Sequence, residues 1–206
     1  MTTTQPAADT KSAEAFAERV FDSVLGLIDS WSIYIGDKLG LYDALAEGAL
    51  TRDELASQTH THWRYMGEWL EQQVTTGILE VDDPAAEPAD RVFSLPEGHR
   101  EVLVDRDSLN YLAPFVRLVT AGGQQLPAIL DAYRNGGGVP WEQYGEDMRT
   151  GQGDMKRPWF VNALASDWFP HASRSTRGSH SPMRVSPTSV AARAGRRSRW
   201  PGGIRV

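Results

Sequence analysis

Acidic residues stop partway along this chain of 206 residues. All 27 aspartates and glutamates lie at or before Asp167, and residues 171–206 contain none. That last segment carries eight arginines and seven serines but no hydrophobic run, so it lacks the side chains needed to build a core. The sequence therefore confines the folded part of the chain to the residues before 171 and predicts a basic disordered tail over 171–206.

The part of the chain before this tail is strongly acidic. It holds 13 lysines and arginines against 27 acids, a balance that suits nucleic-acid binding poorly. There is no cysteine, no apolar run of membrane-spanning length and no secretory signal at the N-terminus. We expect a cytoplasmic protein without membrane contact, with a disordered N-terminus over residues 1–11.

A long amphipathic helix is predicted over residues 12–41. Its apolar residues recur at steps of three and four, which places them on one face of the helix. The face is wide enough to need a partner, so we expect a homodimer in which residues 12–41 and 108–133 pair between copies. The apolar residues are Phe16, Val20, Val24, Leu27, Ile28, Trp31 and Ile35.

The next segment has the order of a winged helix-turn-helix. Thr51 and Glu54 have the spacing of a capping box that opens a helix. A stronger helix follows over residues 62–75, and its apolar face consists of Tyr65, Trp69, Leu70 and Val74. Two short β-prone pieces at 78–81 and 91–95 flank an acidic loop. We therefore predict a mainly α fold, a winged helix-turn-helix with a small β-wing.

A helical extension is predicted to follow the winged-helix domain, which we place at residues 12–104. The extension and its linker cover residues 105–170. Periodicity and composition predict helices over 108–133 and 156–169, a loop over 135–138 and an irregular stretch over 141–153. Pro114 and Gly122–Gly123 are alternative points at which the helix over 108–133 would break.

Four stretches of sequence carry a family resemblance. They read L-G-L-Y-D-A-L at 39–45, L-T-R-D-E-L-A at 50–56, W-L-E-Q-Q-V-T-T-G-I-L at 69–79 and G-G-G-V-P-W-E-Q-Y-G at 136–145. The first three resemble the N-terminal winged-helix domain of actinobacterial class I S-adenosylmethionine-dependent methyltransferases. The fourth resembles the linker that such proteins use.

The resemblance implies the part of a small-molecule methyltransferase that pairs two copies and caps the substrate pocket. The complete relatives bind S-adenosylmethionine in a Rossmann-like domain whose first turn reads D-x-G-x-G-x-G. This chain contains no such motif. We therefore predict that it binds no S-adenosylmethionine and is inactive alone, as a truncated or frame-shifted relative would be.

The tail is interpreted as the missing methyltransferase domain read out of frame. When the third base of each codon is joined to the next two, residues 188–194 can encode D-V-G-C-G-A-G, the missing glycine-rich pattern. The alternative is a genuine disordered tail, whose arginines would bind nucleic acid or an acidic membrane through charge alone. Resequencing the coding DNA across codons 165–206 distinguishes the two.

Four aromatic residues are candidates for a substrate pocket: Trp31, Tyr34, Trp141 and Tyr144. The resemblance supports this role, because methyltransferases with such N-terminal domains often close the pocket with aromatic side chains. Packing in the core or at a dimer interface is the alternative for each of them. No catalytic residue is assigned, since no Ser/His/Asp or paired-carboxylate arrangement has a suitable spacing.

The alternative function is that of a winged-helix transcriptional regulator that binds DNA. The helix over 62–75 occupies the recognition position, and Arg64 would then contact DNA. Acidic side chains on that helix and in the wing loop oppose this reading, because they would repel phosphates. They are Glu68, Glu71, Asp82, Asp83, Glu87 and Asp90.

A metal site is not predicted. His60 and His62 lie two residues apart near a turn, but nothing in the sequence suggests a third ligand. Helix capping or exposure to solvent is the preferred interpretation of both histidines.

Overall fold

The computed structural model describes the backbone of residues 7–163 and the side chains of residues 12–162. The interpretation of residues 171–206 as a disordered, out-of-frame tail lies outside these described residues. None of the described helices is both long enough and apolar enough to span a lipid bilayer.

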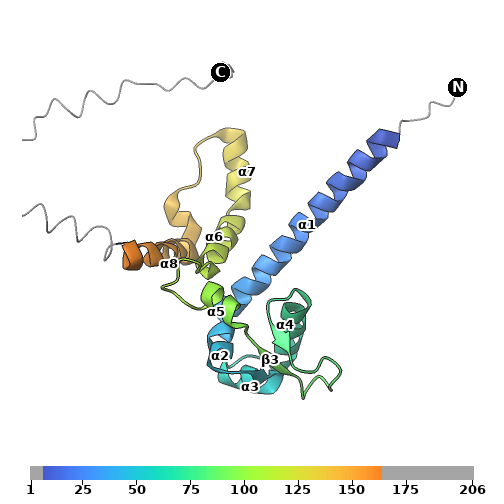
Figure 1. Ribbon diagram of the computed structural model, residues 1–206. Helices are drawn as coiled ribbons and strands as arrows, with labels where there is room; N and C mark the ends of the chain where they lie inside the picture. The colour runs from blue at the N-terminus through green and yellow to red at the C-terminus, as the bar shows by residue number, and fades with distance from the viewer. Residues whose placement is uncertain (1–6, 164–206) are drawn as a thin grey trace, which may run out of the picture. The chain divides into compact units, whose positions relative to one another are not determined.

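The described chain opens with one long helix, α1 (Ala7–Lys38), which begins upstream of the start predicted at residue 12 (Figure 1). Gly40 follows with a left-handed φ of 68°, and α2 (Leu41–Glu47) begins directly after it. Near its C-terminal end, α1 crosses two aromatic rings at Gly36. A Cβ atom added to Gly36 would lie 2.7 Å from Cζ2 of Trp69 and would also overlap Tyr42. This crossing therefore depends on glycine.

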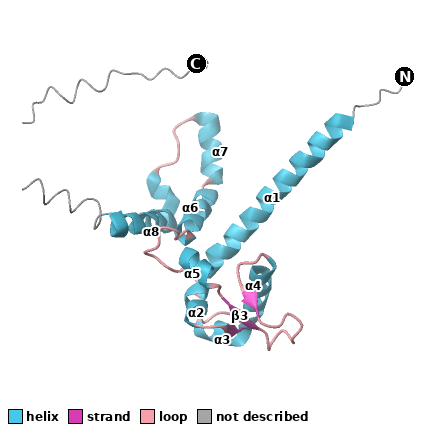
Figure 2. Cartoon of the chain, viewed as in Figure 1, coloured by secondary structure: helices cyan, strands magenta, loops and turns pink. Residues whose placement is uncertain are grey.

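Two further helices and a small sheet complete a compact arrangement with α2. The sheet is antiparallel in the order β1-β3-β2, and Figure 2 shows its strands in magenta. Phe93 of the central strand lies opposite Leu50 on one side and Val81 on the other. The predicted winged helix-turn-helix with a small β-wing is thus confirmed. Its elements are β1 (Leu50–Thr51), α3 (Arg52–Gln58), α4 (Trp63–Thr75), β2 (Glu80–Val81) and β3 (Val92–Ser94).

Local capping explains where α3 and α4 begin. The hydroxyl oxygen of Thr51 accepts a hydrogen bond from the backbone N–H of Glu54, and the Glu54 carboxylate accepts one from the backbone N–H of Thr51. The predicted capping box is therefore present. His62 caps α4, since its Nδ1 accepts a hydrogen bond from the backbone N–H of Arg64 at 3.2 Å.

One hydrophobic core holds these elements together. It gathers side chains from α2, α3 and α4, with one residue of the central strand β3 and one that precedes β2. Partly buried residues of α1 and of the segment after β3 pack against it. The core residues are Leu41, Tyr42, Leu45, Leu55, Ala56, Met66, Trp69, Leu70, Leu79 and Phe93.

The helical extension differs from its prediction in two places. The helix predicted over 108–133 is two helices. Pro114 lies in the first turn of one, and the break falls at Gln125, just after the predicted alternative at Gly122–Gly123. The stretch 141–153, predicted to be irregular, is helical, so that prediction is wrong. The elements are α5 (Glu97–Leu103), α6 (Ala113–Gln124), α7 (Leu126–Asn135), the 3-10 helix η1 (Trp141–Tyr144) and α8 (Gly145–Ala163).

The missed helix α8 contains Gly145, Gly151 and Gly153, which weaken any helical pattern in the sequence. Packing against α6 overrides that weak preference. The loop predicted at the glycine run is confirmed. Gly136, Gly137 and Gly138 all have positive φ values, of 77°, 95° and 76°, a region that other residues rarely adopt.

Candidate functional site

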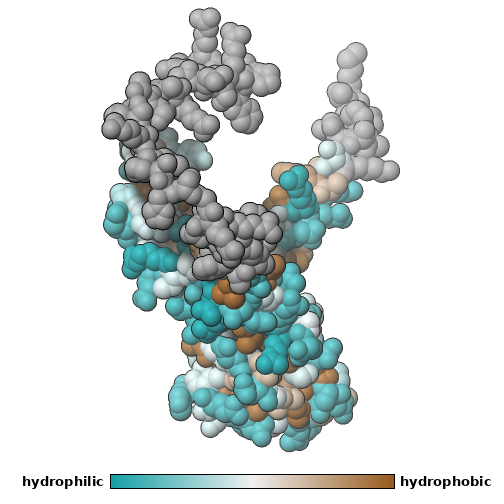
Figure 3. Space-filling model, turned by 60° about the vertical axis from the view of Figure 1, so that its left-hand side comes forward, coloured by the Kyte–Doolittle hydropathy of each residue, from teal (hydrophilic) through white to brown (hydrophobic). Residues whose placement is uncertain are grey.

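The N-terminal half of α1 carries an apolar surface that no described residue covers. Every residue from Ser12 to Ile28 is exposed, and hydrophobic side chains are visible at the surface in Figure 3. Phe16 is 64% exposed and Trp31 is 50% exposed. We call one stripe of these residues the α1 face: Phe16, Val20, Val24, Leu27, Trp31 and Ile35.

A second set of exposed apolar residues lies on the helical extension. Leu112, Phe115 and Val119 lie at and along α6, and Leu126 and Leu130 lie on α7. Soluble monomers rarely leave so much contiguous apolar surface in water. The exposed stripe on α1 and the exposed residues of α6 and α7 are therefore the surfaces of the described chain best suited to protein contact.

The C-terminal half of α1 is fixed to α4 through a buried polar network. Gln73 is fully buried; it accepts a hydrogen bond from the Tyr42 hydroxyl and donates one to the hydroxyl oxygen of Ser32. Ser32 in turn donates to Gln72, and the indole N–H of Trp69 donates to the backbone oxygen of Ser32. These hydrogen bonds fix the orientation of α1 relative to α4.

A second polar junction joins α1 to α8. Asp147 accepts hydrogen bonds from the Tyr34 hydroxyl at 2.5 Å and from Lys38 Nζ at 2.8 Å. Burial opposes ionisation of Asp147, but the hydrogen bonds from Lys38 and Tyr34 outweigh it and lower the pKa of this carboxyl. The hydrogen bond to Asp147 in turn raises the pKa of both Tyr34 and Lys38. Asp147 is therefore an ionised anchor for two side chains of α1.

A third junction places one arginine between two helices. The guanidinium of Arg117, on α6, lies 2.9 Å from Asp37 of α1 and 2.9 Å from Asp154 of α8. The contact with Asp37 is an ion pair without hydrogen-bond alignment at Nε. Burial raises the pKa of Asp37 even though Arg117 opposes that rise. One cation therefore contacts two acids, of which Asp37 is largely buried and Asp154 is more exposed.

The four predicted pocket residues lie on α1 and η1. Trp141 and Tyr144 are close neighbours, with ring centroids 6.1 Å apart. Tyr144 also lines a small surface hollow with Tyr133 and Val139, and the hydroxyl of Tyr34 is held by Asp147. Trp31 belongs to the exposed α1 face. The structure therefore brings Trp141 and Tyr144 together. Tyr34 instead binds Asp147, and Trp31 lies on the exposed α1 face.

The surface that would face DNA has few unpaired cations. Arg91 is paired with Glu71 at 2.6 Å, and Arg52 is paired with Asp53 at 2.8 Å. Arg64 is exposed on the first turn of α4, and Glu68 lies one turn further along the same helix. An arginine already paired with a carboxylate gains less from a phosphate, so this surface is poorly suited to reading DNA.

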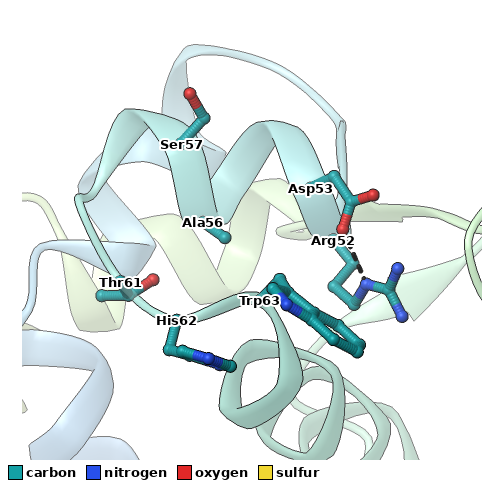
Figure 4. A pocket seen from close by; sticks show the side chains of 7 residues that line it. All are labelled: Arg52, Asp53, Ala56, Ser57, Thr61, His62 and Trp63. Atoms are coloured by element: carbon teal, nitrogen blue, oxygen red, sulfur yellow. Dashed lines mark hydrogen bonds and ion pairs between the residues drawn. The ribbon is translucent and has the colours of Figure 1, made fainter.

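A hollow between α3 and α4 is lined by polar and aromatic side chains. Figure 4 shows Arg52 of α3 beside the ring of Trp63, with the Arg52–Asp53 ion pair marked. The guanidinium carbon of Arg52 lies 4.8 Å from the centroid of the Trp63 ring. Here the arginine is held by a carboxylate and an aromatic ring together. Among the described residues, no group of three or more metal-ligand side chains gathers.

Comparison with known proteins agrees with the winged helix-turn-helix seen in the structure. Residues 28–105 match the family model of the Rv2258c-like winged HTH domain. This segment is a winged helix-turn-helix domain. A search of curated proteins with the whole sequence finds no significant match.

The chain is similar to several solved structures. Mitomycin 7-O-methyltransferase MmcR is 22% identical, with a TM-score of 0.52, over 76% of this chain and 47% of its own. PigF, solved with SAH, is 16% identical, with a TM-score of 0.48, over 75% and 49%. Human N-acetylserotonin methyltransferase, in complex with SAM, is 18% identical, with a TM-score of 0.48, over 81% and 49%.

The likeness to MmcR shows that this chain shares the fold of the matched part of that enzyme. The chain spans about half the length of these solved structures. The resemblance identified in the sequence, to the N-terminal domain of such methyltransferases, is confirmed by the winged-helix match and agrees with this shared fold.

Asp147, Gln73 and Arg117 were not predicted from the sequence. Asp147 lies in the stretch 141–153, which was predicted to be irregular, so no helical pattern indicated that its side chain would face α1. Gln73 carried a usable signal, because it lies one turn after Trp69 on the predicted apolar face of the 62–75 helix. A polar residue at such a position indicates a buried hydrogen-bond network.

Proposed function

We propose that this chain is the N-terminal part of an S-adenosylmethionine-dependent methyltransferase that acts on a small molecule. Its role in that enzyme is to pair two copies and to cap the acceptor pocket. The observation that carries the proposal is the uncovered α1 face, which extends from a winged-helix domain of the fold found in MmcR.

The physical case for pairing rests on α1 itself. Residues 12–28 of α1 are exposed to water, including the apolar residues among them. Little stabilises this part of the helix in a single copy, because tertiary packing supplies most helix stability in proteins. A second copy offers a matching apolar surface on α6, at Leu112, Phe115 and Val119. Two copies related by a two-fold axis would bury the α1 face of each copy against α6 of the other. The same contact would then form twice in the dimer.

The described residues do not fit the donor S-adenosylmethionine. A Rossmann-type donor site needs a parallel strand followed by a glycine-rich turn, whereas the described sheet is antiparallel with strands of two or three residues. The chain's contribution to methyl transfer would therefore be positioning of the acceptor, which lowers the entropic cost of bringing the reactants together.

The acceptor would lie near the aromatic pair on η1. The hollow beside Tyr144 is lined by Ile129, Ala132, Tyr133, Gly138 and Val139, and none of these side chains carries a charge. Such a surface suits an uncharged, partly apolar molecule. Trp141 lies next to this hollow through its contact with Tyr144.

Sedimentation equilibrium of the whole chain tests the pairing. We expect a dimer, and we expect Val24→Asp to raise its dissociation constant by about tenfold or more, because it places a charge in the apolar contact. Ala15→Asp adds the same charge on the opposite side of α1 and is the matched control. A monomer at all concentrations, or equal effects of both variants, would contradict the proposal.

A gel shift separates the proposal from the DNA-binding alternative. We expect no sequence-specific complex with genomic fragments, and no change on replacing Arg64 by alanine. Calorimetry with S-adenosylmethionine should show no binding at micromolar concentrations. A salt-dependent, specific complex that Arg64→Ala abolishes would favour the transcriptional regulator instead.

A further inference from the structure

The helix α8 has a sequence that is poorly suited to a helix. It contains Gly151 and Gly153 in its middle and Pro158 further along. Glycine and proline are the two residues least favourable to helix interiors. Pro158 also removes a backbone donor and crowds the preceding turn. A segment with this composition is not expected to remain helical in water without tertiary contacts.

The docking of α8 on α6 depends on one of its glycines. A Cβ atom added to Gly151 would lie 3.1 Å from the carbonyl oxygen of Pro114 and 3.2 Å from Cδ2 of Leu118. Gly153 is different, since nothing lies within 4 Å of the position of its Cβ. Gly151 therefore permits close contact between the two helices, whereas Gly153 only weakens the helix.

Polar contacts attach α8 along its length. Asp147, in its first turn, holds Tyr34 and Lys38 of α1. Asp154, in its middle, pairs with Arg117 of α6. Near its end, Arg157 lies 2.8 Å from Asp107. All of these bonds link α8 to other elements, so they exist only while α8 is docked.

We propose that α8 is a conditional helix, which folds when it docks on α6 and α1 and unfolds when it leaves them. Undocking would release Tyr34 and Lys38 in the same step, and would free the end of η1 that carries Tyr144. The docking of α8 is thus a two-state element that couples α1 to the Tyr144 hollow. This inference does not depend on the proposed function.

Hydrogen exchange of the whole chain, followed by mass spectrometry, tests the proposal. Gly151→Ala should speed exchange in residues 145–163 by about five- to thirtyfold, while residues 55–70 of the winged-helix core keep their protection. Gly153→Ala is the matched control, because it adds the same methyl group in open space. It should leave exchange in α8 unchanged or slower.

A second variant avoids any added volume. Asp154→Asn weakens the contact with Arg117 and should also speed exchange in α8, whereas Glu146→Gln, which removes a charge from the same helix, should not. Two results would overturn the proposal. One is full protection of α8 in both Gly151→Ala and Asp154→Asn. The other is equal loss of protection in α8 and in residues 55–70, which would make them a single unfolding unit.

Discussion

The hydroxyl of Tyr34 on α1 donates a hydrogen bond to the carboxylate of Asp147 on α8, at 2.5 Å and across 113 positions of sequence. Lys38 donates to the other oxygen of the same carboxylate. Two residues one turn apart on α1 are therefore held by one side chain from the far end of the described chain. This contact joins the winged-helix domain to the helical extension, as does the ion pair between Asp37 and Arg117.

Replacing Asp147 by asparagine should lower the free energy of unfolding by about 1.5–3 kcal/mol at neutral pH, the range for hydrogen bonds to a charged group. Glu146→Gln, which removes a neighbouring charge without touching Tyr34 or Lys38, should change it by less than about 0.5 kcal/mol. Urea unfolding of the three proteins gives both values. Equal effects of the two substitutions would mean that the Asp147 contacts contribute nothing.

The Asp147 contribution should depend on pH. Its pKa is lowered in the folded state, so its stabilisation is complete above the ordinary carboxyl pKa and is lost as pH falls through the lowered value. Asp37 has the opposite shift, because burial raises its pKa, and it partly offsets that loss. Lys38 and Arg117 stay charged throughout the acid range. The stability difference between the native chain and Asp147→Asn should shrink from pH 7 to pH 3.

Gly36→Ala should destabilise the chain by about 1–3 kcal/mol, the usual cost of forcing extra volume into a packed core. The added Cβ would meet the rings of Tyr42 and Trp69. Gly26→Ala is the control on the same helix, where nothing lies within 4 Å of the added atom. Because alanine favours helices, that control should gain about 0.5–1 kcal/mol. Thermal unfolding followed by circular dichroism measures both.

Gln73→Leu should cost about 1–3 kcal/mol, since it leaves the buried hydroxyl of Tyr42 without its acceptor. Tyr42→Phe removes that hydroxyl. The double variant should therefore be less destabilised than the sum of the two single variants, which a double-mutant cycle by urea unfolding would show. Additive effects would indicate that the two side chains do not depend on each other.

Thr51→Ala should cost about 1 kcal/mol, the typical value for losing an N-cap side chain. The substitution removes the acceptor for the backbone N–H of Glu54. Thr75→Ala is a suitable comparison, because the Thr75 hydroxyl donates only to the backbone of its own helix. A stability loss in Thr75→Ala as large as that in Thr51→Ala would argue against a capping role.

Sequence patterns predicted the winged-helix part well because its signals are local. The capping box of Thr51 and Glu54, and the apolar spacing of Trp69 and Leu70, depend only on neighbours in sequence. The contact of Asp147 with Tyr34 depends on a helix that tertiary packing creates from Gly151, Gly153 and their neighbours. Such a contact leaves no pattern in the neighbouring sequence. The aromatic residues of the candidate site could therefore be predicted, but the contacts between their helices could not.

The pairing of Phe93 has a consequence for how the chain is made. Its strand lies between β1 and β2, and its side chain is buried in the core. A chain leaving the ribosome presents its N-terminal residues first. The sheet cannot close until residue 94 has emerged, so α1 and the unfinished core are exposed together during synthesis. Chaperones or a second nascent chain would therefore meet the apolar residues of α1 and of the core before the core residues are buried.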